Sequence, residues 1–282
     1  MPELPEVEIV KRAIEPALSC GVVERVVFYR PNLRFTLPPE LPGQLEGRSI
    51  VSVQRRGKYI TAFSDAGDGF VLHLGMSGVI RIEPHGAPPQ NIKHDHVEIV
   101  MRDGPRIVFN DPRRFGFLQA LQADSWAQYP AFEKMGPEPL GNDFSGPILY
   151  ERLKGRKGAI KAALLNQAVV AGVGNIYACE ALFATAIDPW RAAADLSAKE
   201  CEDLAQAVKD VLRAAIEAGG SSLKDYKHTD GALGYFQHHF KVYDRAGQVC
   251  PRCNSNGSAP EACIEREVQN GRSTFYCVRT QK

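Results

Sequence analysis

The sequence predicts an α+β protein with a helix and a β-rich part first, a helical part next and a short β-structured tail last. Short alternating or β-branched runs recur up to about residue 120, separated by turns rich in Pro, Gly and Asp. Apolar residues at helical spacing dominate the following stretch. Four of the seven cysteines lie within the last 33 residues. A chain of 282 residues is long enough for two domains with separate cores.

The first predicted element is a helix near the N-terminus. Pro2 and Pro5 suit a helix start, because a proline there loses no hydrogen bond that the helix would make. Acidic side chains in the same stretch complement the positive end of the helix dipole. An apolar stripe at helical spacing follows, formed by Val7, Val10, Ile14 and Leu18.

The β-rich part contains five runs with the pattern of strands. They cover residues 22–29, 59–63, 70–74, 96–101 and 106–109. Residues 37–43, 65–69 and 84–90 supply turn-forming Pro, Gly and Asp between them. Short strands at this spacing predict a two-layer antiparallel β-sandwich, flanked by the N-terminal helix.

A loop-like stretch at 122–147 separates the β-rich part from the helical part. Helices are predicted over residues 148–152, 160–170, 176–183 and 198–218. The last of these begins with acidic residues and ends before two glycines, as helices commonly do. From about residue 238 the sequence predicts short strands around the cysteines.

Composition indicates a globular protein inside the cell. Hydrophobic residues make up 44% of the chain and charged residues 24%. No apolar run approaches the roughly 18 residues of a membrane span, and the acidic N-terminus is unlike a signal peptide. We therefore expect a cytoplasmic protein without a membrane partner. The net charge of +1 weighs against a strongly basic nucleic-acid binder, and the basic clusters at 55–58 and 152–161 are, taken alone, more often solvated surface.

Pro2 allows two interpretations. The plain one is a helix start. The other requires removal of Met1, which makes the proline nitrogen a secondary amine with a pKa of about 8, so that part of it is neutral and nucleophilic at pH 7. Its attack on a carbonyl-type carbon gives an iminium, an electron sink like that of lysine Schiff-base enzymes. Glu3 lies beside it in sequence and is a candidate proton shuttle.

The segment 171–177 joins two predicted helices and contains Gly172, Gly174 and Asn175. The glycines permit a tight turn, and a helix that starts near Asn175 offers N–H groups to a phosphate. Together with residues 160–167, the segment has the pattern of a helix–two-turn–helix DNA-binding motif. An odd number of cysteines in a chain without a signal peptide favours thiols or a metal over disulfides.

Eight motifs, in order and over nearly the whole chain, resemble those of bacterial formamidopyrimidine-DNA glycosylases. They are Met1-Pro2-Glu3-Leu4-Pro5-Glu6-Val7-Glu8, Gly57-Lys58-Tyr59, His73-Leu74-Gly75-Met76-Ser77-Gly78, Lys93-His94-Asp95-His96, Asn110-Asp111-Pro112-Arg113-Arg114-Phe115-Gly116, the segment 160–177, Gly234-Tyr235-Phe236-Gln237 and Gly271-Arg272-Ser273-Thr274-Phe275-Tyr276-Cys277. Leu4 favours this branch over the related endonuclease VIII branch.

The resemblance implies a base-excision repair enzyme that removes 8-oxoguanine and formamidopyrimidine lesions from duplex DNA. The damaged nucleotide must be flipped out of the duplex for such chemistry. The resemblance assigns nucleophilic attack to Pro2 and the proton shuttle to Glu3. Strand cleavage by β,δ-elimination then proceeds through a Pro2 Schiff base, and Lys58 and Arg272 donate protons or position phosphates.

The resemblance also implies which residues bind DNA. His73 is among the DNA-binding residues, and the phosphate-binding candidates are His94, Arg156, Lys161 and Asn175. Met76, Arg113 and Phe115 fill the hole left by the flipped nucleotide. Arg113 would also contact the orphaned cytosine. The segment 221–226 is similar to the loop that caps the flipped base in this family.

The tail departs from the family pattern, in which two Cys-x-x-Cys pairs bind one zinc ion. Cys250 and Cys253 form the first pair and Cys277 matches the third ligand, but Thr280 occupies the fourth position. An insert around 254–262 leads to Cys263. Either Cys263 completes an all-cysteine site for one Zn²⁺ per chain, or zinc is weakened or lost and packing alone holds the hairpin.

These inferences predict four parts: a catalytic β-sandwich domain at 1–121, a linker at 122–147, a helix–two-turn–helix DNA-binding domain at 148–237 and a zinc-finger-like β-hairpin tail at 238–282. The predicted partner is damaged double-stranded DNA, bound by a monomer associated with the nucleoid. Two alternatives stay open, namely endonuclease VIII-like specificity for oxidised pyrimidines and binding of damaged DNA without catalysis.

Overall fold

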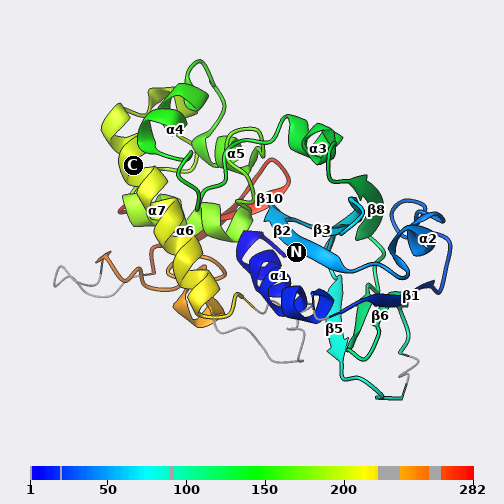
Figure 1. Cartoon of the computed structure of the whole chain (residues 1–282). Helices are drawn as coiled ribbons and strands as arrows, with labels where there is room; N and C mark the ends of the chain where they lie inside the picture. The colour runs from blue at the N-terminus through cyan, green and yellow to red at the C-terminus, as the bar shows by residue number, and fades with distance from the viewer. Residues whose placement is uncertain (1, 20, 89–91, 222–235, 254–261) are drawn as a thin grey trace. The chain divides into compact units, whose positions relative to one another are not determined.

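The computed structural model describes residues 2–19, 21–88, 92–221, 236–253 and 262–282 (Figure 1). The chain divides into two compact units, and each is described by itself. The first comprises Met1–Glu133 and Ala218–Tyr235, and the second comprises Lys134–Glu217 and Phe236–Lys282. Three features predicted from the sequence fall outside the described residues: positions 222–226 of the capping segment, Gly234-Tyr235 and most of the insert before Cys263. The predicted four-part division by function stays a prediction.

Helix α1 (Leu4–Leu18) opens the first unit, as the sequence predicts. Glu3 is its N-cap and forms a capping box with Glu6, whose carboxylate accepts the backbone N–H of Glu3 at 2.9 Å. The apolar stripe that begins at Val7 and ends at Leu18 is buried. The residues that precede the helix are therefore held by its first turn.

Two four-stranded sheets form the β part, and all hydrogen-bonded neighbours within each sheet are antiparallel. The first has the order β1 (Val23–Phe28), β6 (Asp95–Met101), β7 (Arg106–Asn110), β5 (Val79–Glu83), and the second has the order β2 (Ile50–Arg56), β3 (Tyr59–Ser64), β4 (Asp68–His73), β8 (Phe117–Gln122). The predicted antiparallel sandwich is confirmed. Strands β2, β5 and β8 lie outside the five predicted runs.

A single apolar cluster joins the two sheets and α1. Ile99 and Phe109 face it from the first sheet, Ile60 and Leu72 from the second, and Ile14 from the helix. Short helices complete the unit: α2 (Leu41–Leu45), the 3₁₀ turn η1 (Trp126–Gln128) and α3 (Pro130–Glu133). This shared core provides a rigid base for the loops at the strand ends.

The second unit contains the predicted helices, with one correction. They are α4 (Gly146–Leu153), α5 (Ile160–Leu165), α6 (Asn175–Thr185) and α7 (Ala198–Glu217), with 3₁₀ turns η2 (Ala193–Asp195) and η3 (Phe236–His239). The prediction that one helix continues to residue 170 is wrong. Asn166 has extended backbone angles, and its side-chain oxygen accepts the N–H of Ala168 at 2.9 Å, which replaces a helical bond by a local turn.

The tail forms a β-hairpin from β9 (Ile264–Gln269) and β10 (Arg272–Cys277). Asn270 and Gly271 make the two-residue turn with φ angles of 51° and 73°. Positive φ at both positions is the requirement of the hairpin turn that Asn-Gly favours. Among the described residues, no helix has both the length and the apolar character that crossing a membrane requires.

Candidate active site, DNA interface and cysteine cluster

Pro2 lies directly before the N-cap of α1 and is buried, and Glu3 is only 3% exposed. The capping box fixes the Glu3 backbone and places its carboxylate at the first turn of the helix. The helix N-terminus carries a partial positive charge, which disfavours a protonated amine beside it. This position therefore suits a neutral amine with an adjacent carboxylate.

Glu6 links this N-terminal turn to Ser221 of the same unit. Its Oε1 accepts the backbone N–H and the hydroxyl of Ser221, both at 2.9 Å, while its Oε2 accepts the N–H of Glu3. Gly220 approaches closely, because a Cβ there would lie 3.3 Å from Glu6 Oε1 and its φ is +76°. The first position of the predicted capping segment is thus anchored to the turn that holds Pro2.

Lys58 occupies a two-residue turn with Gly57, between the paired residues Arg56 and Tyr59. The turn is held from α1 through Arg55. The Nη1 of Arg55 donates to the Gly57 carbonyl at 3.0 Å, and the Nε of Arg55 donates to Glu8 Oε2 at 2.8 Å. Burial tends to raise the pKa of Glu8, but hydrogen bonds from Arg55 and Arg12 outweigh it and lower that pKa. Arg55 therefore fixes the Gly57-Lys58 turn to α1.

His73 ends β4 and is a neutral imidazole at pH 7. Burial, together with the charges of Lys58 and Arg34, lowers its pKa to about 4. Its ring stacks on Phe117 with centroids 5.3 Å apart, and Nδ1 accepts the N–H of Gly75 at 3.0 Å. The remaining proton is then on Nε2, which can donate a hydrogen bond to an anion.

Three side chains predicted to fill the hole in DNA come from two neighbouring loops. Met76 lies in the loop between β4 and β5, and Arg113 and Phe115 lie in the loop between β7 and β8. Met76 and Phe115 are 36% and 44% exposed, and the Arg113 guanidinium carbon lies 5.1 Å from the centre of the Phe115 ring. The two loops meet at Gly75, where a Cβ would lie 2.4 Å from the Phe115 carbonyl carbon. The hole-filling role of the three residues stays a prediction. His94 lies in a third loop and has a φ of 77°.

In the second unit, Lys161 and Asn175 both converge on the hairpin. Lys161 is completely buried, and its Nζ donates to the Ser273 carbonyl at 3.1 Å and to Thr274 Oγ1 at 2.7 Å. Asn175, the first residue of α6, donates to the same carbonyl at 2.8 Å. Arg156, by contrast, is exposed. In this structure the ammonium of Lys161 therefore faces protein rather than solvent.

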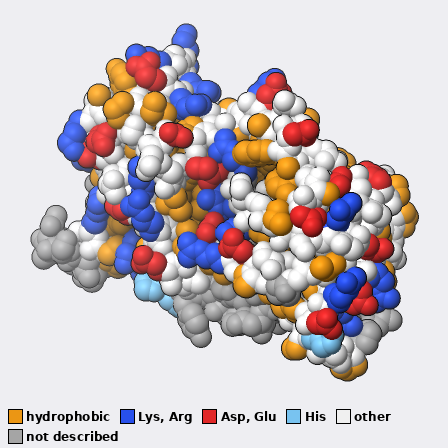
Figure 2. Space-filling view, viewed as in Figure 1, with side chains coloured by type: hydrophobic (Ala, Val, Ile, Leu, Met, Phe, Trp, Pro, Cys, Tyr) orange, Lys and Arg blue, Asp and Glu red, His pale blue; other side chains and the backbone are white. Residues whose placement is uncertain are grey.

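Arg272 is exposed and is the first residue after the hairpin turn. It directly precedes the carbonyl held by Lys161 and Asn175. Figure 2 shows that Lys and Arg side chains on the face in view are interspersed with Asp and Glu. On this face, basic side chains do not form a continuous patch, so exposed charge alone does not identify the phosphate ligands.

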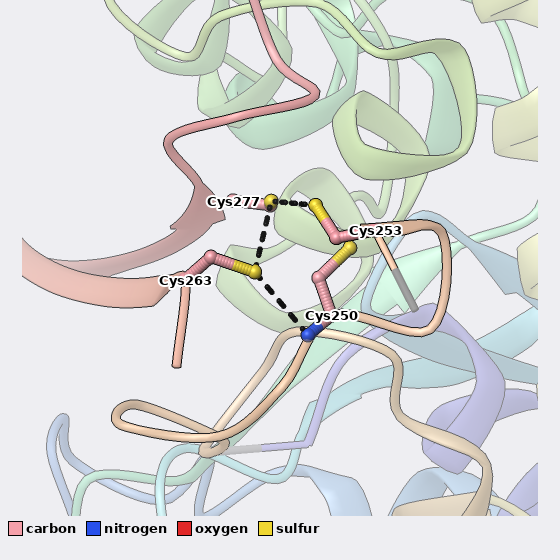
Figure 3. A group of neighbouring side chains, drawn as sticks. All are labelled: Cys250, Cys253, Cys263 and Cys277. Carbon is pink, nitrogen blue, oxygen red and sulfur yellow. Dashed lines mark hydrogen bonds between the residues drawn. The ribbon is translucent and has the colours of Figure 1, made fainter. Parts of the chain in front are cut away.

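The cysteine cluster, formed by Cys250, Cys253, Cys263 and Cys277, lies at the base of the hairpin (Figure 3). The four sulfur atoms all lie within 4.8 Å of one another. Cys277 Sγ is 3.5 Å from Cys253 Sγ and 3.7 Å from Cys263 Sγ. Four thiolates bound tetrahedrally to zinc at about 2.3 Å have sulfurs roughly 3.8 Å apart. The four residues can therefore hold one zinc ion, with Cys263 among them.

Several supporting residues were not predicted from the sequence, namely Glu8, Arg55, Asp111, Glu180 and Ser273. Glu180 is 4% exposed, and its carboxylate accepts the backbone N–H groups of Lys241, Val242 and Tyr243 at 2.8–3.1 Å. It thereby holds the chain that leads into the cysteine cluster. A carboxylate within an apolar helix such as α6 was the available signal, because a buried charge requires hydrogen-bond donors.

Known proteins resemble this chain over its whole length. Its sequence matches the formamidopyrimidine-DNA glycosylase N-terminal domain at residues 1–118 and the formamidopyrimidine-DNA glycosylase H2TH domain at 135–227. The formamidopyrimidine-DNA glycosylases of Methylocella silvestris and Rhodospirillum rubrum are 46% and 47% identical, with full coverage of both chains in each comparison.

Solved structures of formamidopyrimidine-DNA glycosylases have the same fold as this chain. The MutM (Fpg) protein of Thermus thermophilus is 37% identical with a TM-score of 0.84, and the alignment covers 99% of this chain and 98% of that one. The Lactococcus lactis Fpg bound to DNA with an abasic site is 30% identical with a TM-score of 0.87 and full coverage of both. The resemblance inferred from the eight motifs is confirmed, and the chain belongs to the formamidopyrimidine-DNA glycosylase family.

Proposed function

We propose that this protein is a bifunctional base-excision repair enzyme, a DNA glycosylase and AP lyase whose nucleophile is the Pro2 nitrogen. The observation that carries the proposal is the N-terminal Pro2-Glu3 pair, buried and fixed at the start of α1. Full-length similarity to formamidopyrimidine-DNA glycosylases is the reason to interpret this pair as a nucleophile and a proton shuttle. Without that similarity, the same residues would be an ordinary helix start.

In the proposed reaction, the neutral Pro2 amine attacks C1′ of the flipped nucleotide. The bond from C1′ to the base breaks, and Glu3 shuttles the protons that assist sugar-ring opening and base departure. The resulting iminium acidifies the C2′ proton, whose loss expels the 3′ phosphate. A second elimination expels the 5′ phosphate, and hydrolysis of the remaining iminium by water releases the sugar fragment as an aldehyde and restores the Pro2 amine.

The proposed DNA contacts fall into two groups. Lys58, the Nε2–H of neutral His73, and His94 bind phosphates from the first unit, and Arg272, Asn175 and Arg156 do so from the second. Lys58 and Arg272 also assist the eliminations. Met76, Arg113 and Phe115 fill the hole left by the flipped nucleotide, and Arg113 favours lesions opposite cytosine.

The proposed substrates are 8-oxoguanine and formamidopyrimidine lesions in duplex DNA. A complex of a mutant of the Lactococcus lactis Fpg holds DNA containing Fapy-dG, and a complex of the wild-type protein holds DNA containing an oxidised pyrimidine. The second complex is a specific reason to keep oxidised pyrimidines as a second candidate substrate class. We place the enzyme, as a monomer, with the bacterial nucleoid in the cytoplasm, because its proposed substrate is there.

For the metal, we propose one zinc ion bound by Cys250, Cys253, Cys263 and Cys277. The spacing of their four sulfur atoms supports this set. Cys263 then replaces the ligand that the family pattern places at Thr280. When bound, the ion supplies a structural crosslink, which fixes the base of the hairpin that carries Arg272.

Borohydride trapping tests the proposed function. Reduction of the iminium should crosslink the protein to duplex DNA containing 8-oxoguanine opposite cytosine. The matched control is the same chain extended by residues before Met1, which leaves every side chain in place but converts the Pro2 nitrogen into an amide. Crosslinking by the processed chain alone is the expected result. Equal crosslinking by both chains would remove Pro2 as the nucleophile, and no crosslinking by either would refute covalent catalysis.

A further inference from the structure

Asp111 is a completely buried carboxylate at the start of the loop that follows β7. Its Oδ1 accepts the Ser77 hydroxyl at 2.6 Å and the Arg113 N–H at 3.3 Å, and its Oδ2 accepts the Gly116 N–H at 2.8 Å. Ser77 belongs to the loop after β4. One carboxylate therefore joins the loop of Met76 to the loop of Arg113 and Phe115.

Two further features couple the same loops. Ser77 Oγ also accepts the Arg113 N–H at 3.2 Å while it donates to Asp111. The backbones meet at Gly75, where a Cβ would lie 2.3 Å from Gly116 N and 2.4 Å from Phe115 C. Because no side chain fits at this contact, the loops touch through their main chains, and neither can shift without the other.

The Asp111 backbone holds a third loop. Its N–H donates to the His94 carbonyl at 3.1 Å, and its own carbonyl accepts His96 Nε2–H at 2.9 Å. His94 has a positive φ of 77°, which this bond helps to maintain. Side chains from three loops, all proposed to meet DNA, thus depend on one buried residue.

The residues that fix the loops are buried, and the side chains proposed to enter DNA are exposed. Asp111, Ser77 and Gly116 are buried, whereas Met76 and Phe115 are exposed. A buried carboxylate is costly unless it is fully hydrogen-bonded, and here its donors come from the loops themselves. The loops are therefore set before any ligand arrives, which lowers the entropy lost on binding.

We propose that Asp111 is a positioning residue for nucleotide extrusion: it presets the loops so that Met76, Arg113 and Phe115 enter the gap in the duplex together. This inference rests on the proposed function of those three residues. It predicts that loss of Asp111 impairs reactions that require extrusion from a base pair and spares reactions that do not. An abasic site in single-stranded DNA requires none, because no pair or stack is broken.

The test compares Asp111→Asn with Asp65→Asn, a matched change at an exposed turn. Asparagine keeps the size and one acceptor, but its NH₂ group meets another donor at Gly116 or Ser77. Single-turnover rates are measured for 8-oxoguanine duplex, opposite cytosine and opposite adenine, and for a single-stranded abasic site. We expect Asp111→Asn to slow duplex excision at least about tenfold and reduce the cytosine preference, with abasic cleavage within about twofold of wild type.

Ser77→Ala removes only one bridging hydroxyl and covers the case in which Asp111→Asn fails to fold. It should slow duplex excision by about threefold and again spare the single-stranded reaction. An unchanged duplex rate in a folded Asp111→Asn, or equal loss of both reactions in either folded variant, would overturn the inference.

Two controls separate this inference from the proposed function. If wild-type protein cleaves neither substrate, the proposed function fails. If Met76→Ala and Phe115→Ala leave duplex excision unchanged, the hole-filling role fails.

Discussion

In the unit that carries Pro2, buried or half-buried carboxylates hold the functional segments. In the unit that carries Arg272, a lysine, an asparagine and four thiols hold the hairpin, and the buried carboxylate of Glu180 holds the chain before it. Glu6, Glu8 and Asp111 bond to backbone N–H groups, a hydroxyl or an arginine within the first unit. The hairpin of the second unit is held at the Ser273 carbonyl and at the cysteine cluster. The carboxylates have their hydrogen-bond partners without a metal, whereas four adjacent thiols need a metal ion to hold them together. Covalent attack by Pro2 should therefore depend on the first unit, and the metal-dependent part of DNA binding should depend on the second.

Blocking the Pro2 nitrogen should have the largest effect. In the chain extended before Met1, excision and strand cleavage should fall at least about 10³-fold, equivalent to roughly 4 kcal/mol of transition-state stabilisation. Binding of an uncleavable abasic analogue should change far less, because every phosphate ligand is retained. Single-turnover rates and equilibrium titrations measure both. A comparable loss of binding would show that the Pro2 nitrogen contributes to DNA binding as well as to covalent attack.

Acid should destabilise the first unit through His73. Its folded pKa of about 4 lies below its ordinary value, so the unfolded chain binds the proton first and the free energy of unfolding falls as pH drops from about 6.5 to 4. Protonation of His73 in the unfolded chain lowers the free energy of unfolding by about 3 kcal/mol at pH 4. His73→Asn, which keeps an acceptor for Gly75, should lose this pH dependence in denaturant titrations. Parallel curves for wild type and variant would contradict the assignment.

Removing Cys263 should empty the metal site of the second unit. Purified wild type should contain one zinc per chain, and Cys263→Ser should contain almost none and bind duplex DNA about 10- to 100-fold less tightly. Cys201→Ser is the matched control, because Cys201 is also buried but lies on α7, outside the cysteine cluster. Elemental analysis and titration measure the result. Full zinc content in Cys263→Ser would show that the thiol is not a ligand.

The salt dependence of DNA binding should distinguish two basic residues of the second unit. Arg156 is exposed and Lys161 is buried against the hairpin. Arg156→Gln should reduce the slope of log affinity against log salt by about 0.9, the value for one phosphate contact. Lys161→Met should leave the slope unchanged while weakening binding, because it loosens Ser273 and hence Arg272. A slope reduced equally by Lys161→Met would place its ammonium on a phosphate instead.

Local signals predicted much of the fold and the ends of the functional segments. The start of α1 and the start of α6 at Asn175 each follow from short-range chemistry. Strand β8 did not, because its Leu, Gln and Ala residues favour helix, and pairing with β4 decides the outcome. The end of α5 at Leu165 depends on the side chain of Asn166.

The supporting contacts could not be predicted, because they join residues far apart in sequence. Asp111 reaches Ser77, Glu6 reaches Ser221 and Lys161 reaches Ser273. Motifs identify residues that touch a ligand, but only the folded chain shows which side chains hold them. Lys161 illustrates the difference: a basic residue in a DNA-binding motif favours a phosphate contact, yet its Nζ donates to the hairpin.

The most direct test of the central claim is the identity of the atom that becomes attached to DNA. Protein trapped with borohydride on 8-oxoguanine duplex is digested, and the peptide that carries the sugar adduct is sequenced by mass spectrometry. We predict a single adduct at the nitrogen of Pro2, in a peptide that begins with Pro2. An adduct on Lys58 or any other lysine, or on a peptide that retains Met1, would contradict the account.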